Sequence, residues 1–347
     1  MAFFLFGLPT LLFALSSDPK VVLIVIDGVR YLELEGKATD DEGNSVSAES
    51  LFPNLMRLKK QGLFLPEMRI SNPAGISLPA YSDIIAGRRQ EKIVTNEPPK
   101  KDLRSHYPTL FQTIKQGLNL PSNGIALIAS WKPICDVAVM GKGSPESDFY
   151  MSCGWKKEKS FKPEIFPGSR SDMDTYIEFV REVPVWHPRF VFVHFGDADE
   201  EAHFHQAALD NSKVYYGIIH YHNALRQIDY YVGRIWKLLQ EDPFYRDSTT
   251  LIITTDHGRD NIPDPKQWAD HGACRKHRKG KLCDACQQIF GLAVGPGVTP
   301  RVVNTRYTHI DLAPTISRIF GLDMPSSKGK LIKEMFNPDL RAEFGAR

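Results

Sequence analysis

The sequence predicts an α/β fold, in which a mainly parallel central sheet lies between two layers of helices (α/β/α). Apolar runs rich in β-branched residues recur along the chain, and they end near Asp27, Ser130, Phe195, Thr255 and Val294. Segments with the periodicity of a helix lie between these runs. Strands that alternate with helices favour a parallel sheet covered on both faces, which is why we expect three layers.

Four segments place apolar residues at the spacing of a helix: residues 51–62, 107–117, 211–240 and 308–321. Gly62 is placed to end the first helix, and Pro108 to begin the second. The third is the longest, with an apolar stripe that starts at Val214. A further apolar helix is expected after residues 71–77.

Length and composition predict one globular domain. Of the 347 residues, 42% are hydrophobic and 24% are charged, which is typical of a globular chain. We expect residues 18–347 to form a single domain with surface excursions near residues 131–172 and 272–288. A net charge of +2 and the lack of a nucleic-acid-binding motif argue against a nucleic-acid partner.

The first 17 residues, MAFFLFGLPTLLFALSS, form an apolar segment. Its length fits a signal peptide and is short for a membrane span, and Ala14 and Ser16 suit a small-x-small cleavage site. The alternative is a buried strand or helix at the start of the domain. We expect a signal peptide and an exported protein, periplasmic or secreted, with no transmembrane span after this segment.

Acidic and histidine side chains follow three of the predicted strands: Asp27, then Asp199 and His203, then Asp256 and His257. Ligands of parallel sheets bind at the carboxyl ends of the strands, so we expect these residues to meet. Carboxylates brought together repel one another unless cations neutralise them. Asp with His suits zinc, with manganese or iron as alternatives. Taken singly, each residue could instead be a helix cap or a surface side chain.

Two further residues are candidates for the same site. His271, in WADHGAC, follows Asp256 after a short loop, although a lone loop histidine is usually a surface residue. Ser77, in SNPAGISLPAYSDIIAGR, stands where an apolar helix begins, at the positive end of its dipole. A metal bound to its hydroxyl would lower the pKa of Ser77 and make it a nucleophile. The alternative is a simple N-cap, and we expect Ser77 to fill both roles.

The ordered motifs VVLIVIDGVR, ISLPAYSDIIAG, DADEEAH, TTDHG and DHG resemble those of the alkaline phosphatase superfamily. They are most similar to its type I phosphodiesterase/nucleotide pyrophosphatase branch. The resemblance runs from Val21 to about Gly321 and implies a parallel-rich sheet between helices. It also implies two divalent metal ions, usually zinc.

The resemblance implies one ion held by Asp27, Ser77, Asp256 and His257, and the other held by Asp199, His203 and His271. It further implies that Ser77 attacks the phosphorus of a small phosphate ester and forms a phospho-enzyme, which water hydrolyses. Asn96, in IVTNEPP, resembles the residue that donates to a non-bridging phosphate oxygen. The expected activity is that of a two-metal phosphoric ester hydrolase.

Some patterns of related enzymes are incomplete in this chain. The sulfatase pattern C/S-x-P-x-R lacks its arginine, because Tyr81 stands there. No arginine resembles the phosphate-binding arginine of true alkaline phosphatases, which favours diesters or activated monoesters as substrates. The alternatives to the hydrolase are a sulfatase or phospho-group transferase on the same scaffold, or a non-catalytic metal- or phosphate-binding protein.

The five cysteines leave two open questions. Cys135 and Cys153 flank a short segment and could pair in an exported protein. The other three lie in one insertion, where a small zinc knuckle could use Cys274, His277, Cys283 and Cys286. A disulfide or free thiols in a basic surface loop are the alternatives, and they are favoured.

Overall fold

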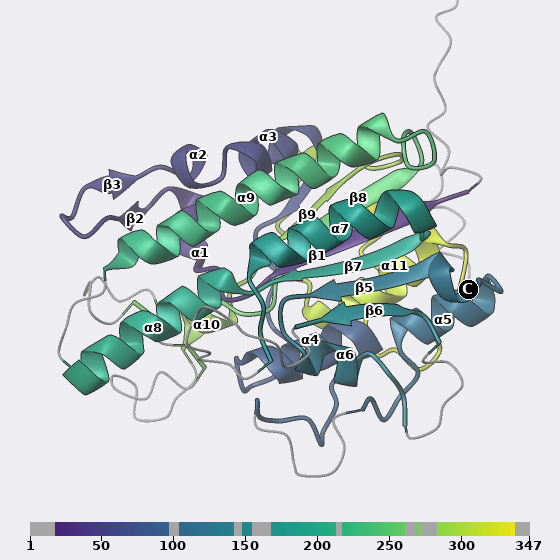
Figure 1. Ribbon diagram of the computed structural model, residues 1–347, viewed down its shortest axis with the longest axis horizontal. Helices are drawn as coiled ribbons and strands as arrows, with labels where there is room; N and C mark the ends of the chain where they lie inside the picture. Colours follow the sequence, from purple (N-terminus) through teal and green to yellow (C-terminus); the bar gives the residue numbers. More distant parts are fainter. Residues whose placement is uncertain are drawn as a thin grey trace, which may run out of the picture.

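The structure is a computed structural model that describes residues 18–96, 104–141, 148–154, 168–212, 217–260, 268–269, 271–272 and 283–336. An eight-stranded sheet forms its centre, with the strand order β10-β4-β9-β8-β1-β7-β5-β6 (Figure 1). Neighbouring strands are parallel, except that β9 is antiparallel to both β8 and β4. The predicted α/β fold with a mainly parallel sheet is therefore confirmed.

The strands of this sheet are β1 (Lys20–Ile26), β4 (Leu63–Leu65), β5 (Ile125–Ala129), β6 (Tyr150–Cys153), β7 (Phe190–Phe195), β8 (Thr249–Thr255), β9 (Gly291–Val294) and β10 (Arg301–Val302). A separate small sheet pairs β2 (Ala38–Thr39) with β3 (Ser45–Val46). All five strands predicted from the sequence are present where their apolar runs end.

The helices are α1 (Tyr31–Glu35), α2 (Ala48–Leu51), α3 (Pro53–Gln61), α4 (Ser77–Ala86), α5 (Leu110–Gly117), α6 (Pro133–Val137), α7 (Asp172–Trp186), α8 (Asp197–Ser212), α9 (Ile218–Glu241), α10 (Asp284–Gln287) and α11 (Leu312–Ile319). Short 3-10 helices are η1 (Ser122–Gly124), η3 (His309–Asp311) and η4 (Lys333–Met335). Helices α3, α7 and α9 cover one face of the sheet, and α4, α5 and α6 cover the other (Figure 1).

Alternation along the central strand β1 produces the two cores. Val22 and Ile24 belong to the core beneath α9, whereas Val21 and Leu23 belong to the core above α4. Successive side chains of a strand point to opposite faces, so an unbroken apolar run is what a strand buried on both faces requires. All seven residues of β1 are buried, which puts the strand in the middle of the molecule.

The predicted helix ends differ from the observed ones in each of the four segments. Residues 51–62 are divided between α2 and α3, and residues 308–321 contain the 3-10 helix η3 before α11. The helix expected over residues 211–240 begins at Ile218, because Gly217 takes a left-handed φ of 86° there and α8 occupies residues up to Ser212. Val214 lies outside the described residues. The helix expected to begin at Pro108 begins at Leu110, where Thr109 forms a capping box with Gln112.

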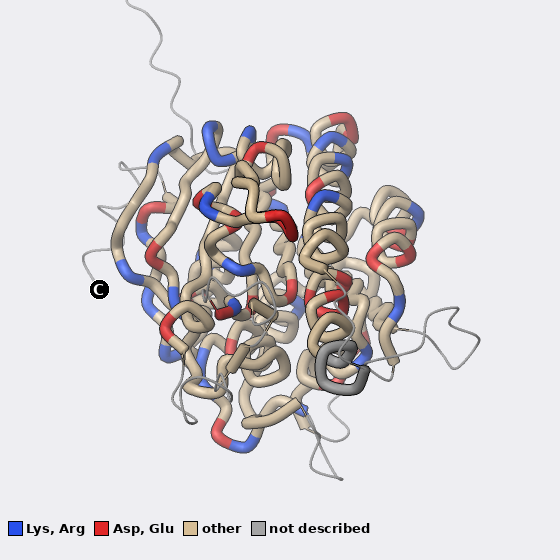
Figure 2. Tube along the Cα trace, turned by 90° about the vertical axis from the view of Figure 1, so that its left-hand side faces the viewer, with Lys and Arg blue, Asp and Glu red and all other residues tan. Residues whose placement is uncertain are grey.

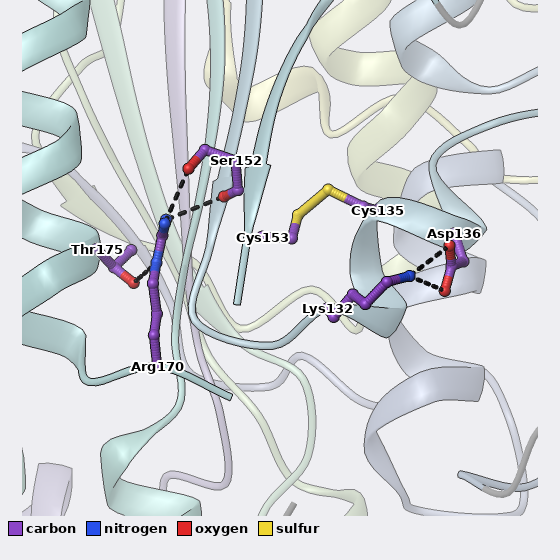
Figure 3. Close-up of a disulfide and its surroundings, with 7 residues drawn as sticks. All are labelled: Lys132, Cys135, Asp136, Ser152, Cys153, Arg170 and Thr175. Atoms are coloured by element: carbon purple, nitrogen blue, oxygen red, sulfur yellow. Dashed lines mark hydrogen bonds and ion pairs between the residues drawn. A yellow bond between two sulfur atoms is a disulfide. The ribbon is translucent and has the colours of Figure 1, made fainter. Parts of the chain in front are cut away.

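The segment 131–172 was expected to be a surface excursion, and part of it belongs to the sheet instead. Strand β6 adds to the sheet edge in parallel register with β5. A disulfide joins Cys135 of α6 to Cys153 of β6, as Figure 3 shows, so the expected pairing is confirmed. The sheet edge and α6 are thereby linked covalently.

The expectations for the chain start and the cysteine insertion fall largely outside the described residues. Residues 1–17, Cys274 and His277 are not described. Cys283 is the N-cap residue of α10, and Cys286 lies within that helix; both are buried. The Cys283 sulfur accepts a hydrogen bond from the backbone N–H of Cys286. The zinc knuckle and its alternatives therefore stay predictions.

Charged residues of both signs occur throughout the part of the chain that the structure describes (Figure 2). Within that part, no helix combines the length and the apolar character that crossing a bilayer requires.

We expect the disulfide to stabilise the domain. Replacing Cys135 and Cys153 together by Ser should lower the free energy of unfolding by about 3 kcal/mol, because a cross-link over 18 residues restricts the unfolded chain. Urea unfolding of the oxidised protein and of the double variant measures the difference. Identical unfolding midpoints would contradict this expectation.

Candidate metal centre and active site

The predicted strand-end residues meet at one edge of the sheet. Strands β7, β1 and β8 are parallel neighbours, so their carboxyl ends lie side by side. Asp27 follows β1, Asp256 and His257 follow β8, and Asp199 lies in the first turn of α8 after β7. The side chains of all four are almost fully buried.

Asp27, Asp256 and His257 form the first candidate metal site, since one ligand atom of each lies within 4.8 Å of the others. The Nε2 atom of His257 lies 3.4 Å from Asp27 Oδ1 and 3.5 Å from Asp256 Oδ2. The Ser77 hydroxyl lies 3.4 Å from Asp27 Oδ1 and 3.4 Å from His257 Nε2. The four predicted ligands of this ion therefore lie together.

Asp199 is the centre of the second candidate site. Its Oδ2 atom lies 3.1 Å from His203 Nε2, and His203 Nε2 lies 3.1 Å from His271 Nε2. Asp199, His257 and His271 also have ligand atoms within 4.8 Å of one another, and the two imidazole rings stack at 4.2 Å. The loop residue His271 thus lies between the two sites.

Backbone carbonyls fix the orientation of two of the imidazoles. His257 Nδ1 donates to the carbonyl of Gly258 at 3.0 Å, and His271 Nδ1 donates to that of Gly75 at 3.1 Å. Burial lowers the pKa of His271 well below its usual range, so its proton on Nδ1 leaves Nε2 with a lone pair, which is the state that binds a metal ion. Burial opposes protonation of His257, but the charge of Asp256 and the contact with Asp27 raise its pKa to about 9, so its Nε2 gives up a proton when it binds a metal ion. Both Nε2 atoms are the ones that face the carboxylates or His203.

The carboxylates show the electrostatic strain that a cation would relieve. Burial raises the pKa of Asp256 well above its usual range, and the nearby charge of Asp27 adds to the effect. The Oδ2 atom of Asp256 is buried and has no hydrogen-bond partner within the described part of the chain. A buried charged oxygen without a partner is unfavourable, so its position between Asp27 and His257 fits a divalent cation.

Asp27 and Asp199 are held in their charged forms by donors around them. Burial and the charge of Asp199 oppose ionisation of Asp27, but hydrogen bonds from His194 and His257 lower its pKa to about 2. Burial also opposes ionisation of Asp199, and the adjacent Arg259 holds its pKa well below the usual range. Charged Asp together with neutral His is the donor set that zinc prefers.

Ser77 does not have the N-cap role that was expected alongside its chemical one. It is the first residue of α4, Ile76 is the N-cap, and no side chain caps the helix there. The Ser77 hydroxyl instead contacts Asp27 and His257. It therefore lies at the positive end of the helix dipole with its oxygen in the candidate metal centre.

Asn96 lies beside Ser77, as its predicted role requires. Its Oδ1 atom accepts the backbone N–H of Leu78 at 2.9 Å, which leaves the Nδ2 group as its donor. Both Ser77 and Asn96 line a small open pocket. The other lining residues are Asp27, Ser130, Trp131, Ser169, His194, Gly196, Asp199 and Glu200.

The sequence reasoning missed several residues of this site. Ser130 and Trp131 follow β5 directly, so the strand-end rule could have included them. His194 is a polar residue inside the apolar run FVFVHF, which was a usable signal. Tyr81 and Arg259 contact Asp27 and Asp199 respectively, and only their closeness to Ser77 and His257 in the sequence hinted at this.

The fold is shared with solved structures of the alkaline phosphatase superfamily. A superfamily protein from Vibrio parahaemolyticus matches with a TM-score of 0.57 and 14% identity, over 92% of this chain and 70% of that chain. The phosphonate monoester hydrolase of Silicibacter pomeroyi matches with a TM-score of 0.60 and 16% identity, over 92% and 76%. Identity this low shows the fold alone.

A third solved structure has a similar extent to this chain. An inactive variant of murine ectonucleotide pyrophosphatase/phosphodiesterase 5, in complex with AMP, matches with a TM-score of 0.59 and 15% identity, over 92% of this chain and all of that chain (100%). No curated protein sequence matches this one.

Residues 21–284 match the family model for type I phosphodiesterase/nucleotide pyrophosphatase, and the chain belongs to that family. The resemblance seen in the motifs is therefore confirmed at the level of family and superfamily. The family, the Silicibacter pomeroyi protein and the murine protein are named for hydrolase activities.

Replacing Asp256 by Asn should stabilise the metal-free protein against unfolding, and it should reduce the stabilisation that zinc provides. In chelator at pH 8 the variant should unfold at a higher temperature, because the raised pKa of Asp256 means that its ionisation opposes folding. Stability of the metal-free protein should accordingly fall as the pH rises above about 4, the ordinary pKa of a carboxyl group, and less steeply in the variant.

With zinc at about 100 times its dissociation constant, the unchanged protein should gain about 2.7 kcal/mol, and Asp256→Asn much less. Thermal unfolding with and without zinc measures both effects. Asp229→Asn is the matched control, since Asp229 is a buried carboxylate that bonds to Asn54 and Leu55 outside the centre. Equal zinc stabilisation of Asp256→Asn and the unchanged protein would contradict the assignment.

Proposed function

We propose that this protein is a two-metal phosphoric ester hydrolase that uses Ser77 as its nucleophile. The observation that carries the proposal is the position of the Ser77 hydroxyl. It lies at the N-terminus of α4, 3.4 Å from Asp27 Oδ1 and 3.4 Å from His257 Nε2, and it lines an open pocket. A serine in this position has both an activating environment and access to a substrate.

The proposed ligands of the first ion are Asp27, Ser77, Asp256 and His257, and those of the second are Asp199, His203 and His271. Zinc suits these donors best, with manganese or iron as alternatives. When bound, the ions supply Lewis acidity: they favour the alkoxide form of Ser77 and neutralise charge that develops on phosphate oxygens.

The reaction then proceeds in two displacements at phosphorus. The Ser77 hydroxyl releases its proton to solvent, and Ser77 Oγ forms a bond to phosphorus as the bond to the leaving oxygen breaks. The leaving alkoxide takes a proton from solvent. Water next attacks the phosphoserine, releases the phosphate product and restores the Ser77 hydroxyl. The dipole of α4 favours the negative charge of the ester at this position.

A small phosphodiester is the substrate class that the pocket favours. Among the described residues that line it, none is Lys or Arg, so a dianionic monoester would find no cationic side chain there. Asn96 supplies a neutral donor for one non-bridging oxygen, which suits the single charge of a diester. Membership of the phosphodiesterase family supports the same class, and AMP bound to the murine relative supports a nucleotide-sized ligand.

The alternatives are less well supported. A sulfatase needs an arginine where this chain has Tyr81, and the Tyr81 hydroxyl is already bonded to Asp27. A non-catalytic binding protein would have no need of a serine oxygen held within the ligand cluster. A phospho-group transferase would use the same phospho-enzyme, so product analysis in the presence of an alcohol distinguishes it from a hydrolase.

We also propose export through a signal peptide at residues 1–17. The disulfide between Cys135 and Cys153 supports this location, because disulfides persist in oxidising compartments. Sequencing the N-terminus of the mature protein tests the proposal directly.

Ser77→Ala should abolish turnover and keep most of the bound metal. We expect the rate of bis-p-nitrophenyl phosphate hydrolysis to fall at least a thousandfold, as for the loss of a covalent nucleophile. Elemental analysis of the same preparation should still find metal, because Asp and His supply the other ligands. A fully active Ser77→Ala protein would end the nucleophile assignment.

Asn96→Asp tests the phosphate contact without removing the backbone contact. The Asp carboxylate can still accept the N–H of Leu78, but it cannot donate to a phosphate oxygen. We expect kcat to fall about 100- to 1000-fold, the range for loss of one donor to a developing oxyanion. Steady-state kinetics on the same diester measure this, and an unchanged kcat would contradict the role of Asn96.

A further inference from the structure

Asp27 presents its two carboxylate oxygens to different partners. The Oδ2 atom accepts a hydrogen bond from the Tyr81 hydroxyl at 3.1 Å and lies 3.3 Å from His194 Nε2. A charged carboxylate can only accept, so His194 donates from Nε2. The Oδ1 atom instead lies 3.4 Å from both Ser77 Oγ and His257 Nε2. Only Oδ1 therefore faces the first candidate metal site.

The two carboxylate oxygens of Asp256 also differ in their partners, because backbone groups bind only one of them. Its Oδ1 atom accepts the N–H of Gly28 at 2.9 Å and the N–H of His257 at 2.8 Å. Its Oδ2 atom, without a partner within the described residues, lies 3.5 Å from His257 Nε2. The first site thus receives one oxygen from each of two carboxylates.

The two carboxylate oxygens of Asp199 differ because an arginine binds only one of them. Its Oδ1 atom accepts from the guanidinium of Arg259, and its Oδ2 atom lies 3.1 Å from His203 Nε2. Arg259 is completely buried, and it also donates to the backbone carbonyls of Gly28 at 2.9 Å and of Ala269. A planar guanidinium with three fixed acceptors cannot turn, so it holds Asp199 Oδ1 in one direction.

We propose that Tyr81, His194 and Arg259 are positioning residues that make Asp27 and Asp199 each bind a metal ion through one defined oxygen. The inference rests on the proposed function, because it takes the two ions from it. Tyr81 and His194 act on the first site through Asp27, and Arg259 acts on the second site through Asp199. The metal affinity of each site therefore depends on its own set of hydrogen-bond donors.

The same contacts make the two sites unequal. The first site has two carboxylates, Asp27 and Asp256, whereas the second has Asp199 alone, already in contact with the positive charge of Arg259. Charges at such short range interact strongly in a buried environment, so a divalent cation is favoured at the first site. The first ion added to the metal-free protein should bind there and more tightly than the second.

A purely structural role would have a different signature. Arg259 also connects the Gly28 and Ala269 loops, and Tyr81 packs edge-on against His194 at 5.0 Å. If these contacts served only the fold, a variant would unfold more easily and would bind both ions with unchanged relative affinity. Site-selective loss of metal affinity is what a positioning role requires.

Calorimetric titration of the metal-free, full-length protein with zinc tests the proposal. Tyr81→Phe removes only the hydroxyl that donates to Asp27, and Arg259→Lys keeps the charge but loses the planar guanidinium. Tyr245→Phe is the matched control, since Tyr245 is equally buried and its hydroxyl donates to the Pro188 carbonyl away from the centre. Thermal unfolding of each metal-free variant checks that it is folded.

We expect two unequal binding steps in the unchanged protein and in Tyr245→Phe. Tyr81→Phe should weaken only the tighter step, and Arg259→Lys only the weaker step, each by about 10- to 100-fold, as for other partners of metal ligands. Equal steps in the unchanged protein, or unchanged steps in a folded Tyr81→Phe, would overturn the inference and leave the proposed function standing. An unchanged protein that binds no zinc would overturn both.

Discussion

The mutual repulsion of three buried carboxylates is the constraint on which the rest of this site depends. Strands β7, β1 and β8 are parallel neighbours, so the sheet itself brings Asp199, Asp27 and Asp256 to one edge. Burial strengthens the repulsion because little solvent remains to screen it. Hydrogen-bond donors bind one oxygen of each carboxylate, and histidine nitrogens lie near the other oxygen. In the proposed function, two divalent cations bound at those remaining oxygens would complete the neutralisation.

The backbone around the centre is shaped by the same crowding. Gly28 adopts a φ of +66°, and a Cβ atom there would lie 2.6 Å from Asp199 Oδ1 and 2.7 Å from the Arg259 guanidinium. Only glycine therefore lets Asp199 and Arg259 approach the end of β1. Gly258 follows His257, and a Cβ atom there would lie 2.3 Å from the carbonyl of Ala285. Both glycines allow close packing directly beside a proposed metal ligand.

The sequence could predict the fold and the meeting of most ligands, because both follow from strand ends. Long apolar runs end just before Asp27, Asp256 and His257. Because the strands that these runs form are parallel neighbours, the three residues must lie at the same edge of the sheet. Contacts made across the fold were out of reach: nothing in the local pattern around Arg259 reveals that its guanidinium reaches Asp199, 60 positions away. The start of α9 was missed for a related reason, since its apolar stripe continues past the glycine that begins the helix.

Whether this carboxylate and histidine cluster holds two metal ions, as proposed, is best tested by counting the ions. The purified protein should be stripped with chelator, reloaded with zinc, freed of excess metal, and measured by elemental analysis against protein concentration. We expect about two zinc ions per chain, with a third only if the cysteine insertion also binds one. A protein that retains no zinc after reloading would contradict this proposal.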